Sequence, residues 1–398
     1  MSINPVIAGV GMIPFGKFPG LSLSDLACGA ARAAMDDCGI DAAAIDAVFS
    51  ANSAAGILTG QESIRGQVSL KAAGIGGAPL FNVENACASG SSAVHLATQY
   101  IKAGAAHCVL VVGHEKMVTS DKSLPFRALE ACSDIAELAA LKESLGPDGA
   151  QRSIFMDYYA QKVRAYFAAS GAGAEHLAAI AAKNHSNGAL NPNAQFQTAR
   201  TVEDVLNARP IVDPLTLLMC SPISDGAAAL ILVSPQWARE HQKSGPEITA
   251  SAFATDSFAT GSPQMEALAQ RAYAQAGIKA SDIDLAEVHD ATAAGELFEY
   301  ENLGLAERHQ GWRLVADGHV ALGGRVPVNP SGGLLARGHP IGATGVAQIC
   351  ELAWQLRGDA GARQVKGANV GVAQCAGGQS SFGRTSGAAA LCLTVVRS

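Results

Sequence analysis

The sequence has few charged residues and no long apolar run. Only 16% of its 398 residues are charged and the formal net charge is −7, which argues against nucleic acid as the main partner, because phosphate binding requires a concentrated basic face. No uncharged apolar stretch reaches about 18 residues, so we expect no membrane-spanning helix. The first residues have no basic segment before an apolar run, so we also expect no signal peptide.

Cysteine and histidine are present, but not in disulfide or metal-binding patterns. Nine cysteines are spread over the chain without a C-x-x-C pair, which favours reduced thiols and a cytoplasmic location. None of the ten histidines has zinc-site spacing, so we expect no metal and no permanently bound cofactor. A complete dinucleotide fingerprint, a phosphate-binding P-loop and a G-x-S-x-G serine elbow are also missing.

Two pairs of segments in the chain resemble each other. Cys38–Asn52 (CGIDAAAIDAVFSAN) and Ala276–Asp290 (AGIKASDIDLAEVHD) both predict the end of a helix, a Gly-Ile turn and an apolar strand. A weaker similarity links Phe81–Gly104 to Val328–Gly358, since each ends in an amphipathic helix that an apolar strand follows. Strands that alternate with helices predict mixed α/β layers. We therefore expect two similar α/β halves.

A long segment interrupts the first half. It lies between the apolar strand Cys108–Glu115 and the strand Gly226–Ser234, and it contains helical patterns at Ser153–Ser170 and Glu175–Asn187. An excursion of this length usually forms a lid or a substrate-binding subdomain. The predicted parts are an N-terminal half (1–117 and 216–243), an inserted loop domain (118–215) and a C-terminal half (244–398).

Four segments place a reactive side chain beside small residues: CAS at Cys87, HDAT at His289, GHP at His339 and CAG at Cys375. Cys87 and His339 come just before equivalent helices of the two halves, whereas His289 and Cys375 are predicted to follow strand ends. Strand C-termini and helix N-termini meet at one edge of such sheets, where α/β proteins bind ligands. If the halves pack about a pseudo-twofold axis, Cys87 and His339 converge.

Each of these residues also has a structural explanation. Cysteines are most often small buried hydrophobes, which applies to Cys87 and Cys375. His339 could serve only its own loop, and His289 could pair with a neighbouring carboxylate. The small residues and the helix N-terminus after Cys87 favour a reactive thiolate. The five glycines and two prolines of Asn329–Gly345 favour a loop shaped around a ligand.

In this order and spacing, the four motifs resemble those of the thiolase superfamily. Glu287–Leu305 and Pro214–Ser234 are similar to the branch related to the thiolase part of sterol carrier protein x. The similarity covers essentially the whole chain. It implies the thiolase-like α/β fold, a duplicated five-layered α-β-α-β-α arrangement with an inserted loop domain.

The resemblance also implies a role for each site residue. Cys87 would take an acyl group from a CoA thioester, and His339 would deprotonate it. Cys375 would act as the acid/base toward the second acyl unit or the CoA thiol. The backbone amides of Cys87 and Gly377 would bind the acyl-enzyme oxyanion, and His289 would help His339 to bind a second oxyanion.

The implied activity is that of an acyltransferase of lipid metabolism. It would cleave a 3-oxoacyl-CoA with coenzyme A, or run the reverse Claisen condensation, as a homodimer or homotetramer. Some relatives also work with a small zinc-ribbon/OB-fold partner protein. Two alternatives are another condensing enzyme of the aldol or decarboxylating type, and a non-catalytic acyl-CoA-binding subunit.

One departure from the family pattern concerns the acyl chain. Ala291 and Thr292 follow His289 and Asp290, where the family usually has Cys-Phe. Small side chains at these positions predict a wider pocket, and hence a branched or ring-bearing acyl group.

Overall fold

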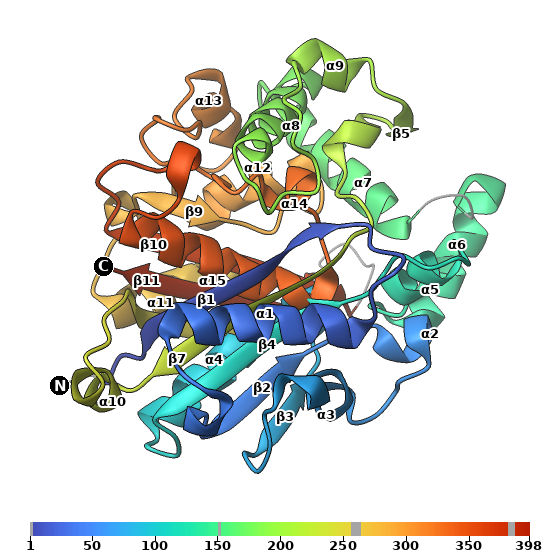
Figure 1. The fold of residues 1–398 in the computed structure, drawn as a ribbon. Coiled ribbons are helices and arrows are strands. Elements are labelled where there is room, and N and C mark those ends of the chain that lie inside the picture. Colours follow the sequence, from blue (N-terminus) through green and yellow to red (C-terminus); the bar gives the residue numbers. More distant parts are fainter. Residues whose placement is uncertain (1–2, 150–152, 256–263, 381–386) are drawn as a thin grey trace.

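The computed structural model describes residues 3–149, 153–255, 264–380 and 387–398. Nine strands form one mixed sheet in the order β3-β2-β4-β7-β1-β8-β11-β10-β9 (Figure 1). The strands are β1 (Val6–Gly16), β2 (Ala47–Ala51), β3 (Leu80–Val83), β4 (Cys108–Glu115), β7 (Asp225–Val233), β8 (Glu247–Thr255), β9 (Leu285–Glu287), β10 (Val370–Gln379) and β11 (Ala388–Arg397). A separate hairpin pairs β5 (Pro210–Val212) with β6 (Leu215–Thr216).

The sheet consists of two halves with the same pairing pattern, which confirms the predicted duplication. In the N-terminal half β2 runs parallel to β4, followed by the antiparallel strands β7 and β1. In the C-terminal half β9 runs parallel to β10, followed by the antiparallel strands β11 and β8. A parallel bridge from Ala286 to Val328 takes the place that β3 has beside β2. The halves join at the single residue pair Val6 and Glu247.

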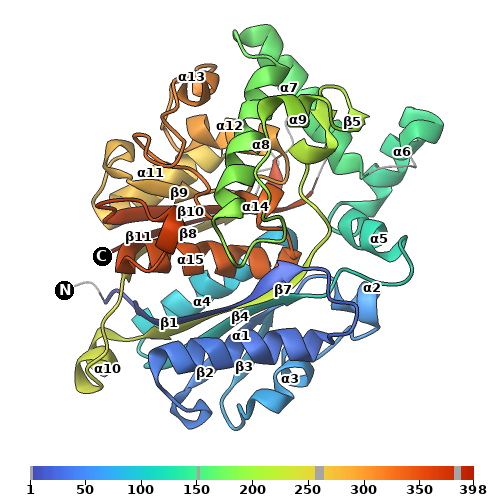
Figure 2. The same cartoon turned by 45° about the horizontal axis from the view of Figure 1, so that its top comes forward.

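Helices separate the two halves and cover them. α4 and α15 pack against each other, and both contact strands of both halves (Figure 2). On the outer faces α1 contacts β1, β4 and β7, and α11 contacts β8 and β11, which completes five layers. The helices outside the insert are α1 (Leu23–Cys38), α2 (Ala55–Thr59), α3 (Arg65–Ser69), α4 (Ser89–Lys102), α10 (Pro235–Glu240), α11 (Gln264–Ala276), α12 (Ala293–Asn302), α13 (Gly311–Ala316), α14 (Gly333–Ala336) and α15 (Ile341–Arg357).

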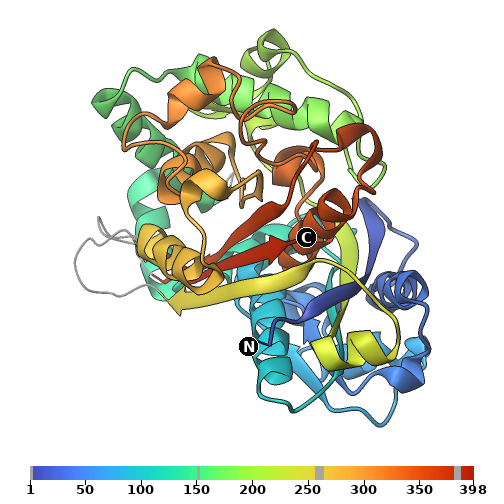
Figure 3. The same ribbon diagram turned by 90° about the vertical axis from the view of Figure 1, so that its left-hand side faces the viewer.

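The composition of α15 explains its central position. Thirteen consecutive residues from Ile341 to Ala353 are buried, and all of them except Gln348 and Glu351 are apolar or small. A helix of this composition can be accommodated only inside a core. α15 ends at Gly358, whose left-handed backbone (φ +82°) forms the C-cap. Seen from the side, the blue and cyan N-terminal elements lie below the orange and red C-terminal elements (Figure 3).

The insert is largely helical; α7 and α8 lie against the C-terminal half, whereas α5 contacts α2 of the N-terminal half. Two of its helices, α7 and α8, fall on the helical patterns predicted from the sequence. α8 contacts α12, α13 and α14, and α7 contacts α12. The helices of the insert are α5 (Leu124–Glu130), α6 (Ile135–Gly149), α7 (Ile154–Ala169), α8 (Ala174–Ala189) and α9 (Val202–Leu206).

One strand differs from its prediction. The apolar run ends near Cys375, but β10 continues to Gln379 because β11 pairs with it along this whole length, with Cys375 opposite Cys392 and Gln379 opposite Ala388. The prediction that Cys375 follows a strand end was therefore wrong, since Cys375 and Gly377 lie inside β10.

Two other expectations can be compared with the structure. None of the nine cysteines, all of which lie in described residues, forms a disulfide. Across the described ranges, every helix is too short or too polar to cross a bilayer.

Candidate active site

A tight turn between β3 and α4 presents Cys87. Ala86 has a left-handed backbone (φ +50°), which is uncommon for a residue other than glycine, and a single 3₁₀ turn, Ala86–Ala88, leads into the helix. β10 passes directly beside this turn: a Cβ atom on Gly377 would lie 2.2 Å from the Asn85 carbonyl oxygen. Glycine at 377 therefore allows β10 to approach the cysteine turn.

His339 lies at the equivalent turn before α15 and faces Cys87. Its backbone N–H donates to Ser224 Oγ at 3.1 Å. The Thr344 hydroxyl donates to the Pro340 carbonyl oxygen at 3.1 Å and lies 2.7 Å from His339 Nδ1. Because that hydroxyl proton is already used, the Thr344 oxygen accepts from Nδ1–H. This leaves the bare Nε2 pointing at Cys87 Sγ, 3.3 Å away, as a base would.

Burial sets the protonation of this pair. Burial raises the pKa of the Cys87 thiol well above its usual value, and Cys132, Cys375 and Glu115 act in the same direction. Burial, with the nearby His289 and Arg337, lowers the pKa of His339. The expectation that the helix N-terminus favours a thiolate at Cys87 was therefore wrong for the resting protein, where desolvation dominates. The pair rests as neutral thiol and neutral imidazole.

His289 joins the pair from the loop after β9. Its ring lies 5.1 Å from the His339 ring, centroid to centroid, in an edge-to-face arrangement. Its backbone N–H donates to Gln374 Oε1, but neither ring nitrogen has a hydrogen-bond partner. Burial lowers its pKa to about 4. The ligand atoms of Cys87, His289 and His339 all lie within 4.8 Å of one another.

Cys375 lies behind the cysteine turn. Its thiol is fully buried and donates to the Cys87 carbonyl oxygen at 3.2 Å, and burial raises its pKa to about 12. The neighbouring residues Ala376 and Gly378 line the cavity described below, as do Cys87 and both histidines. The structure thus brings three of the four predicted side chains to the cavity wall and places the fourth one layer deeper.

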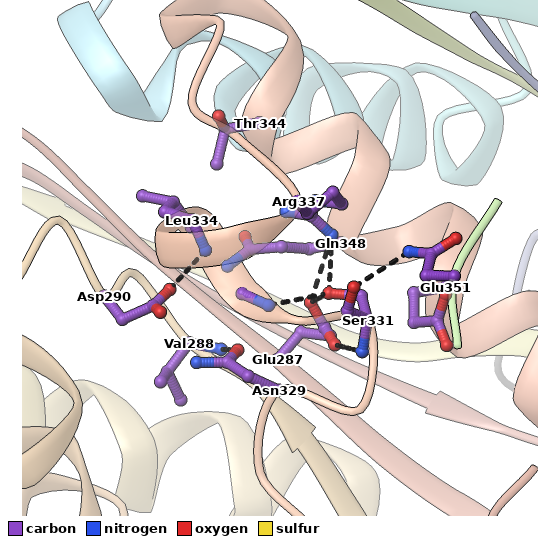
Figure 4. A network of polar contacts seen from close by, with 12 residues as sticks. Glu287, Val288, Asp290, Asn329, Ser331, Leu334, Arg337, Thr344, Gln348 and Glu351 are labelled. Atoms are coloured by element: carbon purple, nitrogen blue, oxygen red, sulfur yellow. Dashed lines mark hydrogen bonds and ion pairs between the residues drawn. The ribbon is translucent and has the colours of Figure 1, made fainter. Parts of the chain in front are cut away.

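Two buried carboxylates shape the loop that carries His339 (Figure 4). Asp290 Oδ1 accepts from the Leu334 N–H at 2.6 Å. Glu287 Oε2 accepts from the Ser331 hydroxyl at 2.7 Å and from Arg337 Nη1 at 3.1 Å. The neighbouring carboxylate Asp290 is therefore used by the loop backbone and does not pair with His289.

A cavity of about 1110 Å³ opens from Cys87 between the two halves and the insert. Tyr159 of α7 and Phe298 of α12 line it, together with Cys132 from the loop after α5. The sequence offered no signal for Cys132, because it lies in the insert outside any motif.

Only one of the two small residues after His289–Asp290 opens this cavity. Ala291 lines it, whereas Thr292 is buried and caps α12, with Oγ1 accepting from the Gly295 N–H at 3.3 Å.

Comparisons with known proteins place the chain in a family. The family model described as "Thiolase, N-terminal domain" matches residues 5–236, and "Thiolase C-terminal domain-like" matches residues 247–386. The chain is 38% identical over 379 residues to the acetyl-CoA acetyltransferase of Methanothermobacter thermautotrophicus, covering 94% of this chain and 96% of that protein. It is also 38% identical over 386 residues to sterol carrier protein 2 of Bos taurus, covering 92% of this chain and 68% of that protein.

Two solved structures show the same fold. The Ltp2–ChsH2(DUF35) aldolase superposes with a TM-score of 0.80 at 26% identity, covering 99% of this chain and 98% of that chain. Human mitochondrial 3-ketoacyl-CoA thiolase in complex with CoA gives a TM-score of 0.71 at 18% identity, covering 100% of this chain and 98% of that chain.

Proposed function

This chain belongs to the thiolase family of acyltransferases, and we propose that it cleaves a 3-oxoacyl-CoA with coenzyme A through an acyl-Cys87 intermediate. The observation that carries the proposal is the 3.3 Å contact between His339 Nε2 and Cys87 Sγ, with the tautomer fixed by Thr344. A nucleophile beside an oriented base is the arrangement that acyl transfer requires.

The first half-reaction begins with proton transfer from Cys87 to His339. The thiolate attacks the 3-oxo carbon, whose oxygen takes the negative charge, and the backbone amides of Cys87 and Gly377 stabilise it. The C2–C3 bond then breaks and its electron pair stays on C2. The Cys375 thiol turns from the Cys87 carbonyl oxygen toward the cavity, and its proton converts this fragment into acetyl-CoA. His289 and His339 stabilise the thioester oxyanion of that fragment. Donors of this kind contribute about 2.7–4 kcal/mol each.

The second half-reaction releases the acyl group. A CoA thiol loses its proton to Cys375, and its sulfur attacks the acyl-Cys87 carbonyl. The C–S bond to Cys87 breaks, acyl-CoA leaves, and His339 returns the proton to the Cys87 thiolate. The role of Cys375 is testable against Cys392, its buried partner opposite in β11. Cys375→Ser should still form the acyl-enzyme but lose turnover, whereas Cys392→Ser should keep turnover; normal turnover in Cys375→Ser would assign the acid/base elsewhere.

An aldol-type reaction is a second candidate, because the Ltp2–ChsH2(DUF35) aldolase shares the fold with a TM-score of 0.80. The two reactions differ in one requirement: thiolysis consumes a free CoA thiol, and aldol cleavage does not. Product analysis with and without added CoA distinguishes them. We expect acyl-CoA and acetyl-CoA only when CoA is added; release of an aldehyde or ketone in its absence would favour the aldolase.

We further propose a branched or ring-bearing acyl chain. The size of the cavity, about 1110 Å³, and Ala291 in its wall support this substrate class. Ala291→Phe should lower kcat/KM for such substrates by roughly 10–200-fold and leave acetoacetyl-CoA cleavage nearly unchanged. Wild-type turnover restricted to acetoacetyl-CoA would contradict this assignment.

Assembly is a separate proposal. A homodimer or homotetramer is supported by β3, a sheet-edge strand on which Phe81 is 40% exposed. Sedimentation of the wild type and of Phe81→Glu tests this; a monomeric wild type would exclude it.

A small partner protein, as in the DUF35-containing neighbour, is a further proposal. It would be required if the pure chain turns over no thioester until such a protein is added.

A further inference from the structure

The catalytic end of the cavity holds three metal-ligating side chains from separate elements. The sulfur of Cys87, one ring nitrogen of His289 and one ring nitrogen of His339 lie within 4.8 Å of one another, and all three residues line the cavity. From this cluster we propose that the resting protein binds Zn²⁺ between these side chains, and that the bound ion inhibits acyl transfer.

The distance between Cys87 and His339 suits a tetrahedral ion. Zinc binds sulfur at about 2.3 Å and imidazole nitrogen at about 2.0–2.1 Å, so tetrahedral sulfur and nitrogen ligands lie roughly 3.5 Å apart. His339 Nε2 and Cys87 Sγ are already 3.3 Å apart. One thiolate with two imidazoles is also a donor set that binds zinc more tightly than magnesium or calcium.

His289 provides an independent observation. It is 7% exposed, and both of its ring nitrogens are buried without a hydrogen-bond partner, a situation that calls for an explanation in a folded protein. In the catalytic proposal an oxyanion engages this ring only transiently. A cation would occupy one of these nitrogens in the resting state. Since no hydrogen bond holds the His289 ring, the ring can turn toward the ion without losing a hydrogen bond.

The hydrogen bonds around His339 also suit a ligand role. The Nδ1–H donates to Thr344 Oγ1 at 2.7 Å, and an oriented outer hydrogen bond of this kind fixes the nitrogen that faces the metal. On binding, the Cys87 thiol releases its proton to solvent, a sulfur–zinc bond forms, and nothing is oxidised or reduced. The fourth position faces the cavity and accepts water. A thiolate bonded to zinc cannot attack a thioester, so the ion inhibits.

Cadmium titration of the whole chain tests the site. Cd²⁺ reports thiolate binding by its ultraviolet charge-transfer band, and calorimetry with Zn²⁺ gives the stoichiometry. We expect one ion per chain, with Cys87 protected from iodoacetamide. Cys87→Ser should abolish the band. His289→Asn should weaken binding by at least about 10–100-fold, with thermal unfolding showing that each variant is folded.

Cys132 provides the matched control, because it lines the same cavity and lies near Cys87. Cys132→Ser should bind cadmium like the wild type. Three results would overturn the proposal: no cadmium band in the wild type, a band that His289→Asn leaves unchanged, or loss of the band in Cys132→Ser, which would indicate a two-cysteine site. Because each readout is a binding signal, these outcomes are independent of whether the chain proves to be a thiolase.

Discussion

The two turns that meet at the cavity occupy equivalent positions in the duplicated halves but have different surroundings. The Cys87 turn has a partly exposed cysteine and a left-handed Ala86. The His339 loop lies within residues 326–353, which are buried throughout, and the carboxylates of Glu287 and Asp290 hold it. A nucleophile must be reached by substrate, whereas a base must stay fixed in position and tautomer. The same backbone position thus serves two tasks through different packing.

The largest expected effect comes from removing the base. Glutamine at position 339 has no basic nitrogen, so His339→Gln should lower the rate of Cys87 acylation by about 10²–10⁴-fold. Single-turnover kinetics with an acyl-CoA measures this rate. His185→Gln is the matched control, because His185 is also a buried histidine but lies on α8, outside the lining of the cavity. Equal acylation by His339→Gln and the wild type would remove His339 from the mechanism.

The next effect concerns the buried ion pair between Arg337 and Glu287, which holds the His339 loop. Arg337→Met leaves the buried Glu287 carboxylate without its cation, which should lower the free energy of unfolding by about 3–5 kcal/mol. The double variant Glu287→Gln/Arg337→Met should recover part of this loss. Chemical denaturation measures both.

An exposed ion pair in the N-terminal half provides the comparison for this buried pair. Glu62 pairs with Arg65 but its side chain is 75% exposed, so Glu62→Gln should change stability by only about 0–1 kcal/mol. Equal losses from Arg337→Met and Glu62→Gln would show that the buried pair does not hold the loop.

Low pH should reduce the stability of the folded protein through His289 but not through Cys87. The folded pKa of His289 is lowered to about 4 by burial, from an ordinary value of 6.5. As pH falls from about 6.5 to about 4, the unfolded chain therefore binds a proton that the folded chain excludes, and stability decreases, by about 3 kcal/mol for this group. His289→Asn should flatten this part of the stability–pH curve, whereas Cys87→Ser should leave it unchanged. Parallel curves for His289→Asn and the wild type would contradict the assignment.

The smallest effect concerns the left-handed residue in each of the two turns, Gly338 and Ala86. Gly338 has a φ of +108°, and a Cβ atom there would lie 2.7 Å from Ser224 Oγ, so Gly338→Ala should cost about 1–3 kcal/mol. Ala86 already carries a Cβ atom at φ +50°, and Ala86→Gly should change stability by no more than about 1 kcal/mol. Thermal unfolding of both variants measures the difference; a larger loss from Ala86→Gly would reverse the comparison.

Local patterns in the sequence predicted the duplicated halves, the helices α7 and α8, and the convergence of Cys87 with His339. They failed where long-range contacts decide. Pairing with β11 extends β10 past Cys375, and packing of residues far apart in the chain desolvates Cys87 enough to raise its pKa. The Glu287–Arg337 pair was missed because charged residues are usually exposed, and only the folded chain shows this pair to be buried.

The central claim is that Cys87 carries the acyl group, and intact-protein mass spectrometry tests it most directly. After incubation with a panel of acyl-CoA and 3-oxoacyl-CoA thioesters, we predict a mass increase of one acyl group per chain. Peptide mapping should locate it on Cys87, and Cys87→Ser should lack it. An acyl group on another residue, or full turnover by Cys87→Ser, would contradict the account.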